Sequence, residues 1–289
     1  MYGYGYQYSS ILKSGGGGVA PFVGLLDDYP SAAAAYSLRQ LSSSYSGDAI
    51  RVRRASDNAE LNIGFVANEL DTSALTTFAS GTDGFVTTWY DQSGNSNDAT
   101  QSTAGNQPQI VSSGSVNIEG IKPSTTFDSS DGFVLSSGFT LSNFTILWVA
   151  KRFSTNNNGM VLTGNSGSQF MGDDINGNGN PYVNCAAGAL ISISNLNTSA
   201  SNIETTYHLS YANRRNSTES VGQFNNSNNS YNNTSSNADV NISRISKYSG
   251  GDASFDYVGN IQEIIIYASD QSTNRTGISN NINDFYSIY

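Results

Sequence analysis

Apolar and polar residues alternate along several short segments of the chain, as they do in half-buried strands. Residues 85–90 alternate aromatic or β-branched side chains with threonines and run into a polar turn at residues 93–95. Residues 144–150 are apolar on both faces, which is typical of a strand in the middle of a sandwich. Further strands are predicted at residues 50–53, 120–128, 132–135, 207–211 and 258–267. The pattern therefore predicts an all-β protein.

Three segments instead show helical features. A short helix is predicted over residues 31–41, where Ser31 would cap a run of alanines and leucines. A second helix is predicted over residues 71–78, with Asp71 as its N-cap. A third, amphipathic helix would close the chain and pack on the sandwich. Its apolar positions are Ile278, Ile282, Phe285 and Tyr289.

Residues 1–28 differ in composition from the rest of the chain. Alternating tyrosines precede four consecutive glycines at residues 15–18, which form a flexible joint. Tyrosines with small spacers can lie extended on another protein and give a large contact area at low entropy cost. We interpret residues 1–28 as an attachment arm, with a disordered tail as the alternative, and residues 29–289 as one domain. The attachment residues would be Tyr2, Tyr4, Tyr6 and Tyr8.

Composition limits the partners and the chemistry. The net charge of −10 and the pI of about 4.4 argue against nucleic acid or an anionic membrane as the main partner. Cys185 is the single cysteine and His208 the single histidine, so neither an intrachain disulfide nor a Cys/His zinc site is expected. No cofactor is expected. Met1 is not followed by a signal-peptide pattern, which predicts synthesis in a cytoplasm without signal-dependent export.

The segment Tyr90–Asn97 reads Tyr-Asp-Gln-Ser-Gly-Asn-Ser-Asn, and together with residues 37–47 and 51–57 it resembles the catalytic domain of fungal α-L-arabinofuranosidase B. Residues 257–267, followed by a helix, are similar to the closing elements of laminin-G-like jelly rolls. The resemblance implies a concanavalin A-like jelly-roll sandwich with a short N-terminal helix, a C-terminal helix and the extended arm. The combination also resembles structural proteins of marine bacteriophages.

The family resemblance implies a retaining glycosidase mechanism, which needs two carboxyl groups about 5 to 5.5 Å apart. In the family the acid/base is an aspartate in a Gly-Gly-Asp context, which Asp252 matches. The nucleophile is a glutamate, whereas the nearest region here, residues 169–176, offers Asp173 and Asp174. A shorter carboxylate displaces the attacking oxygen, and a misplacement of about 1 Å can cost ~10²-fold in rate. The family's adjacent cysteine pair is also missing. The sequence thus predicts a non-enzyme, with these three aspartates as weak catalytic candidates.

The polar turn after residue 90 offers two kinds of binding site. Trp89, Tyr90, Asp91, Asn95 and Asn97 are candidates for glycan binding through an aromatic face and planar polar groups. The same turn could hold calcium, or be stabilised by hydrogen bonds from its Asp and Asn side chains. The weak calcium candidates are Asp91, Asn95, Asn97 and Asp98.

Other polar residues have simpler interpretations. His208 is expected to be a surface or hydrogen-bonded side chain, and Trp148 to be in the core. Glu263 would be buried within its strand unless a bulge or a partner intervenes. Three arginines could clamp an anion, but solvation or pairing with nearby carboxylates is favoured. They are Arg51, Arg53 and Arg54, and the carboxylates are Asp48, Asp57 and Glu60.

These observations lead to a preferred function and an alternative. The preferred function is a bacteriophage virion structural protein, a capsid decoration, head fibre or tail appendage at the virion surface, made in the host cytoplasm. Its partners would be other virion proteins, further copies of itself, as in a trimer, and host-surface glycans. The alternative is a carbohydrate-active protein, either an arabinofuranosidase-like glycoside hydrolase or a lectin-like module.

Overall fold

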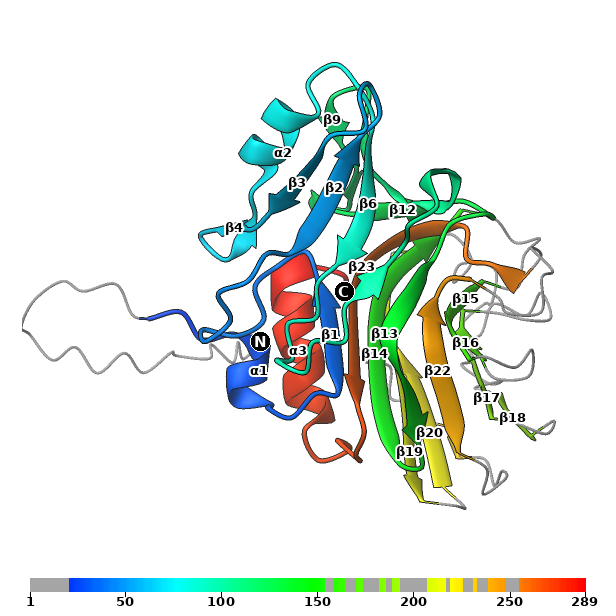
Figure 1. Cartoon of the computed structure of the whole chain (residues 1–289). Coiled ribbons are helices and arrows are strands. Elements are labelled where there is room, and N and C mark those ends of the chain that lie inside the picture. The colour runs from blue at the N-terminus through cyan, green and yellow to red at the C-terminus, as the bar shows by residue number, and fades with distance from the viewer. Residues whose placement is uncertain are drawn as a thin grey trace, which may run out of the picture.

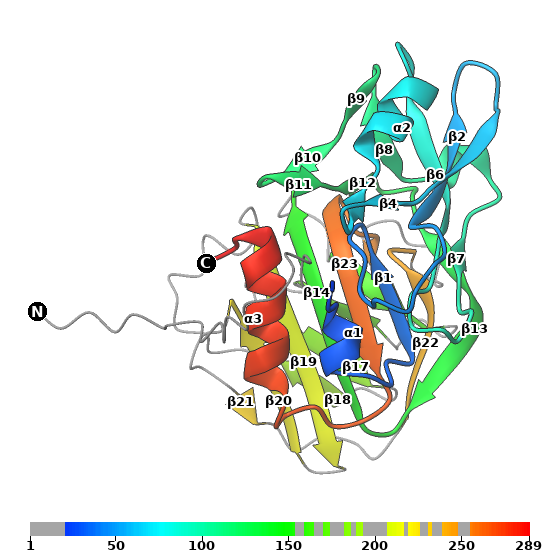
Figure 2. The ribbon, with the colours of Figure 1, turned by 90° about the vertical axis from the view of Figure 1, so that its left-hand side faces the viewer.

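A computed structural model describes residues 21–153, 159–164, 170–173, 182–185, 189–192, 207–216, 219–225, 231–232, 239–247 and 255–289. The described part is dominated by one large, curled, antiparallel sheet with three α-helices (Figures 1 and 2). The prediction of an all-β protein is therefore confirmed. Among the described helices, none is long and apolar enough to cross a lipid bilayer.

The helices are α1 (Leu25–Asp28), α2 (Thr72–Phe78) and α3 (Arg275–Tyr286), with a 3-10 turn at Ala104–Asn106. The strands of the first half are β1 (Ala34–Ser37), β2 (Ile50–Arg54), β3 (Glu60–Ile63), β4 (Phe65–Val66), β5 (Glu69–Leu70), β6 (Gly84–Trp89), β7 (Ala99–Thr100), β8 (Gln109–Ser112), β9 (Ser115–Val116), β10 (Ile118–Glu119), β11 (Lys122–Pro123), β12 (Thr125–Phe127) and β13 (Phe133–Leu141). The strands of the second half are β14 (Phe144–Arg152), β15 (Met160–Thr163), β16 (Phe170–Gly172), β17 (Tyr182–Cys185), β18 (Ala189–Ser192), β19 (His208–Asn216), β20 (Glu219–Phe224), β21 (Tyr231–Asn232), β22 (Val240–Ile245) and β23 (Gly259–Tyr267).

The strands β14 and β23 form the middle of the molecule and are buried on both faces. They pair antiparallel, with Trp148 opposite Ile264, and β19 continues the sheet on the other side of β14. Because side chains alternate across a strand, Leu147 and Val149 pack with α1 and α3, while Ile146 and Trp148 pack into a second core. Figure 2 looks onto the face that α1 and α3 cover. The predicted central position of residues 144–150 is thus confirmed.

The second core lies between this central layer and strands that curl over it. The strand β13 pairs with β22, which also pairs with β15, and β7 joins β6 to β13 (Figure 1). Trp89 contacts both Tyr36 and Phe133 in this core, with ring centroids 6.1 and 6.3 Å from its own. At one end the sheet extends into a lobe made of β2, β3, β6, β8, β9 and α2 (Figure 1).

The predicted helix over residues 31–41 is wrong, because this segment contains β1. Ala34–Ser37 is fully buried and pairs with Ile266–Glu263 of β23. Small alanines fit this crowded inner position, and the pairing overrides their helix propensity. The first helix is instead α1, within the segment assigned to the arm, and it buries Leu25 and Leu26. Residues 1–20, including the four attachment tyrosines, lie outside the described residues.

The other two helix predictions are confirmed. Asp71 caps α2, since its Oδ1 accepts a hydrogen bond of 2.9 Å from the Ala74 N–H. The helix α3 buries Ile278 and Ile282 against the central sheet, whereas Tyr289 lies beyond its end.

Glu263 in β23 is buried, as the alternation along the strand predicted, although a bulge and polar partners are both present. The pairing of β14 with β23 shifts register between Val149 and Ala150. The Glu263 carboxylate is 1% exposed and accepts hydrogen bonds from Arg39, Ser37 and Tyr286. This network ties β1, β23 and α3 together.

Candidate functional site

Asp173 is a carboxylate at the end of β16 and has no exposed surface. Its Oδ1 accepts a hydrogen bond of 2.7 Å from Trp148 Nε1, and His208 Nε2 lies 3.1 Å from the same oxygen. Trp148 comes from β14 and His208 from the neighbouring β19, where His208 is opposite Ala150. The two side chains therefore stand on the same face of the sheet, as alternation along paired strands requires.

Two glycines allow β16 to bring Asp173 this close. A Cβ atom on Gly172 would lie 2.2 Å from the backbone oxygen of Gly159. Gly159 has φ of +42°, and a Cβ there would lie 2.7 Å from Arg152 Nε. The Asp173 N–H donates to that same Gly159 oxygen at 3.1 Å. Only glycine at both positions leaves room for this approach.

The surroundings keep Asp173 ionised. Burial alone would raise the pKa of its carboxyl, but the charge and hydrogen bonding of His208, the Trp148 N–H and Arg152 hold that pKa below its usual range. Burial, reinforced by the Asp173 carboxylate, raises the pKa of Tyr257 well above its ordinary value. Among the described residues, no donor hydrogen-bonds Asp173 Oδ2. The described residues thus hold a buried anion whose Oδ1 is fixed by Trp148 and His208, with the Tyr257 hydroxyl also interacting with the carboxylate.

Sequence reasoning identified Asp173 but missed its neighbours. His208 was expected at the surface or in a hydrogen bond, and it is fully buried next to Asp173, with its ring 4.9 Å from that of Phe224. Trp148 is in the core, as predicted, and its indole N–H serves the carboxylate. The sequence could have pointed to these neighbours because His208 is the single histidine and Trp148 lies in an apolar strand. Nothing in the sequence, however, pairs either residue with Asp173. Asp174 and Asp252 lie outside the described residues.

The polar turn is built around Asp91, which is 4% exposed. Its carboxylate accepts hydrogen bonds from the N–H groups of Ala35, Ser93 and Asn97 and from the Ser93 hydroxyl, at 2.8 to 3.0 Å. Asn95 and Asn97 donate to backbone oxygens of residues 32 and 33. The turn therefore fastens the start of β1. Its geometry matches the alternative of a turn stabilised by its own Asp and Asn side chains.

The remaining candidates of this turn are dispersed. Trp89 is fully buried between Tyr36 and Phe133, while Asp98 accepts a hydrogen bond from the Asp91 N–H. Tyr90 is half-buried and points elsewhere, donating its hydroxyl to Asn62 Oδ1 at 3.0 Å. Within the described ranges, no three His, Cys, Asp or Glu side chains gather as a metal site would need.

The basic cluster in β2 is paired with carboxylates, as predicted. Arg51 contacts Glu60 and Arg54 contacts Asp57, whereas Arg53 donates to Gln107 and Asn58. These pairs and amide contacts occupy the cluster, so it does not form an anion clamp.

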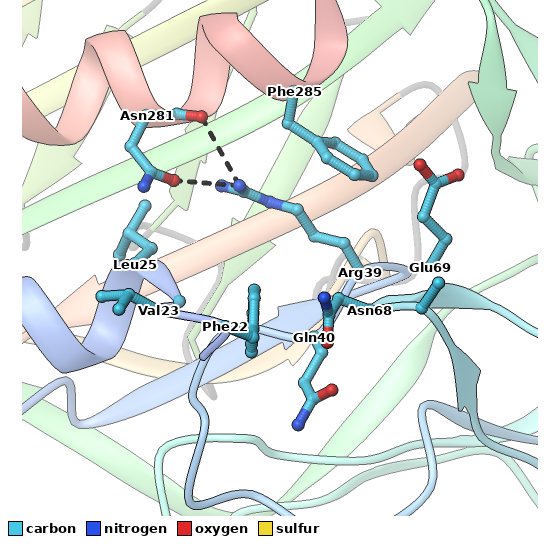
Figure 3. A pocket seen from close by; sticks show the side chains of 11 residues that line it. Phe22, Val23, Leu25, Arg39, Gln40, Asn68, Glu69, Asn281 and Phe285 are labelled. Carbon is cyan, nitrogen blue, oxygen red and sulfur yellow. Dashed lines mark hydrogen bonds between the residues drawn. The ribbon is translucent and has the colours of Figure 1, made fainter. Parts of the chain in front are cut away.

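Figure 3 shows a cavity of about 230 Å³ between α1, the β4–β5 turn and α3. Arg39 points into it, with Asn281 and Phe285 of α3 beside the guanidinium. Arg39 already donates to Glu263 and Asn281, and cations approach the Phe285 ring from both Arg39 and Lys122. The Arg39 guanidinium is therefore already used in hydrogen bonds that hold α3 on β1 and β23.

One family model and several solved structures are similar to this chain. The family model "Alpha-L-arabinofuranosidase B, catalytic" matches residues 27–122. Three similar solved structures are an arabinofuranosidase complexed with arabinofuranosyl-α-1,2-xylobiose, a GH54 α-L-arabinofuranosidase soaked with a cyclic sulfate inhibitor, and a mutant of a GH54 enzyme soaked with 4-nitrophenyl α-L-arabinofuranoside. Each is 18% identical, with TM-scores of 0.64, 0.64 and 0.62 in that order, and the match covers 92% of this chain. A search of curated proteins gave no match.

These findings support the predicted resemblance to arabinofuranosidase B, and the shared fold extends over most of the chain. The chain spans 66% of the length of these three structures. The prediction that the chain is not an enzyme is corrected, because the matching family model describes a catalytic domain and the similar structures are glycosidases. That prediction relied on a glutamate missing from residues 169–176 and on the missing cysteine pair. At 18% identity, the alignment with these structures does not determine which residue of this chain occupies the position of the nucleophile.

Proposed function

We propose that the chain is an arabinofuranosidase-like glycoside hydrolase that releases α-L-arabinofuranosyl groups from a polysaccharide, on a concanavalin A-like jelly-roll scaffold. The family match and the shared fold support this assignment. The alternative function predicted from the sequence is therefore closer to these findings than the preferred one. No comparison supports a phage virion protein, and the arm, the oligomer and the virion location stay predictions.

The observation that carries the proposal is the ionised carboxylate of Asp173, whose Oδ1 is fixed by Trp148 and His208 and whose Oδ2 has no close donor among the described residues. A nucleophile must be unprotonated, whereas a general acid needs a raised pKa. Asp173 therefore fits the nucleophile's role. Oδ2 would attack the anomeric carbon as the bond to the leaving oxygen breaks, and water would later release the sugar. Because Asp173 has no exposed surface, this step requires displacement of the side chains that cover it.

Asp252 is the proposed acid/base. It would give its proton to the leaving oxygen and then take one from the attacking water. This role rests on the Gly-Gly-Asp wording at residues 250–252. Asp174 is the competing nucleophile, since it follows Asp173 directly.

The experiment is hydrolysis of 4-nitrophenyl α-L-arabinofuranoside by the wild type and by Asp173→Asn, Asp174→Asn and Asp252→Asn. We expect kcat to fall by about 10³-fold or more for Asp173→Asn and Asp252→Asn. Asp239→Asn is a matched control, because Asp239 is exposed and its contacts among the described residues are with Ser142 and Arg214, away from Asp173 in the sheet. Circular dichroism would establish that each variant is folded.

A wild type that hydrolyses neither this substrate nor arabinoxylan refutes the proposed activity. Loss of hydrolysis in Asp174→Asn with full activity in Asp173→Asn would transfer the nucleophile's role to Asp174.

A further inference from the structure

A polar groove lies on the lobe formed by β2, β3 and β6, on strands other than those that hold Asp173. Its volume is about 410 Å³. All its lining residues are polar: Arg51, Glu60, Thr87, Thr88, Thr100, Gln101, Ser102 and Gln107. We call this surface the threonine groove.

The groove follows a row of side chains across four paired strands. Asn62 of β3 is opposite Arg51 of β2, Arg51 is opposite Thr88 of β6, and Thr88 is opposite Thr100 of β7. Neighbouring strands lie about 4.8 Å apart, so the row from Asn62 to Thr100 spans about 15 Å. Thr88 is half-buried and the other three are exposed. Tyr90 stands at the Asn62 end, where its hydroxyl donates to Asn62.

The floor of the groove is fixed by hydrogen bonds. Gln107 is 5% exposed, accepts from Arg53 Nε at 2.7 Å and donates to the Gln101 backbone oxygen at 3.0 Å. Gln101 in turn donates to the Gly132 oxygen at 2.6 Å. A fixed floor loses little conformational entropy when a ligand binds. Thr88 and Thr100, which are opposite each other on paired strands, line the groove beside this floor, and the Thr100 hydroxyl lies 3.5 Å from the Val134 backbone oxygen.

The charge of the groove selects the ligand. Arg51 Nε lies 2.5 Å from Glu60 Oε2, so the two charges of the lining compensate each other within a protein of net charge −10. A cationic or anionic polymer would find no unpaired charge here. A protein partner would need an apolar centre, and the lining contains no apolar side chain. Hydroxyl, amide and guanidinium groups, with an aromatic ring at one end, suit sugar hydroxyls.

We propose that the threonine groove is a second glycan-binding site, which holds a strand of neutral polysaccharide such as unsubstituted xylan away from Asp173. This inference deepens the proposed function, because it names the polymer that the enzyme would grip. Binding in the groove does not itself require catalysis. Tyr90, a predicted glycan-binding residue, belongs to this surface in the proposal.

The test is affinity electrophoresis of the whole chain in gels that contain linear xylan, which has no arabinosyl groups to release. The variant is Thr88→Val/Thr100→Val, which removes two hydroxyls and keeps the shape of the side chains. Each neutral hydrogen bond contributes about 0.5–1.5 kcal/mol, so the loss of two should raise Kd for xylan by about 5- to 150-fold. Thr140→Val is the matched control, as Thr140 is an exposed threonine in β13 outside the groove.

We expect the wild type and Thr140→Val to be retarded equally and the double variant to be retarded less, all with unchanged hydrolysis of 4-nitrophenyl α-L-arabinofuranoside. No retardation of the wild type, equal retardation of the double variant, or stronger retardation by polygalacturonate than by xylan would each overturn the inference. Failure of the proposed function would give a different result. The wild type would then not hydrolyse the substrate, but its retardation by xylan would still depend on the two threonines.

Discussion

Replacing Arg39 with methionine tests the buried network that joins β1, β23 and α3. Glu263 is 1% exposed and accepts four hydrogen bonds, two of them from the Arg39 guanidinium at 2.8 and 3.0 Å. Burial alone would lower the pKa of Arg39, but Glu263 outweighs burial and raises it, so the guanidinium stays charged. Methionine keeps the apolar stem and removes the charge. Glu263 would then be a buried anion with only the Ser37 and Tyr286 hydroxyls as donors.

Breaking a buried pair by removing one partner costs about 3–5 kcal/mol. That is a large part of the roughly 5–15 kcal/mol that holds a typical protein folded. The assay is equilibrium urea unfolding of the wild type, Arg39→Met, Glu263→Gln and the double variant. Gln at position 263 still accepts from Ser37 and Tyr286 without leaving a charge, so the double variant should be more stable than Arg39→Met. A loss below about 1 kcal/mol in Arg39→Met, or a double variant that is no more stable, would refute the reasoning.

Two further variants probe a raised pKa and a close backbone contact. Burial, and then the neighbouring Asp128 carboxylate, raises the pKa of Asp131 from 3.8 to about 6, so the folded state holds this proton more tightly than the unfolded state. The stability from that protonation is greatest below about pH 4 and is lost as the pH rises through about 6. Asp131→Asn should therefore stabilise the protein at pH 8, by about 1–2 kcal/mol after screening, and leave it unchanged at pH 4, as thermal unfolding at both values would show. An equal effect at both pH values would contradict this. Gly172→Ala would place a Cβ atom 2.2 Å from the Gly159 oxygen and should cost about 1–3 kcal/mol, whereas Gly105→Ala, with no atom within 4 Å, should cost under about 0.5 kcal/mol.

The sequence predicted the elements whose pattern is local. The strands around residues 85–90, 144–150 and 258–267 and the helix capped by Asp71 all follow from periodicity and capping. Residues 31–41 were misassigned because four buried residues of this segment pair with β23, more than 220 residues later in the chain. Local propensity contains no information about such a partner. For the same reason, a helix was not expected at residues 25–28.

The candidate site was predictable only in part, because its contacts are non-local. Asp173 was identified through the family resemblance, yet Trp148 and His208 reach it from strands 25 and 35 residues away. The threonine groove was not predicted, since the row from Asn62 to Thr100 exists only once β3, β2, β6 and β7 are paired. Alternation along β6 places Thr88 on the face opposite to Trp89. It does not show which residues lie beside it.

The two proposed sites differ in how far their polar groups are buried, and this difference affects the chemistry that each site can support. Asp173 is fully buried, so its charge acts in a medium of low dielectric, where electrostatic interactions are strong and an unpaired oxygen is costly. Such a cost is tolerated at sites where the group is used in chemistry. The threonine groove is a polar surface whose two lining charges compensate each other, so each contact with a ligand contributes little. Weak contacts spread over several strands suit a surface that holds a long polymer and releases it. The arrangement therefore favours a division of labour, with bond cleavage at Asp173 and polymer holding on the lobe.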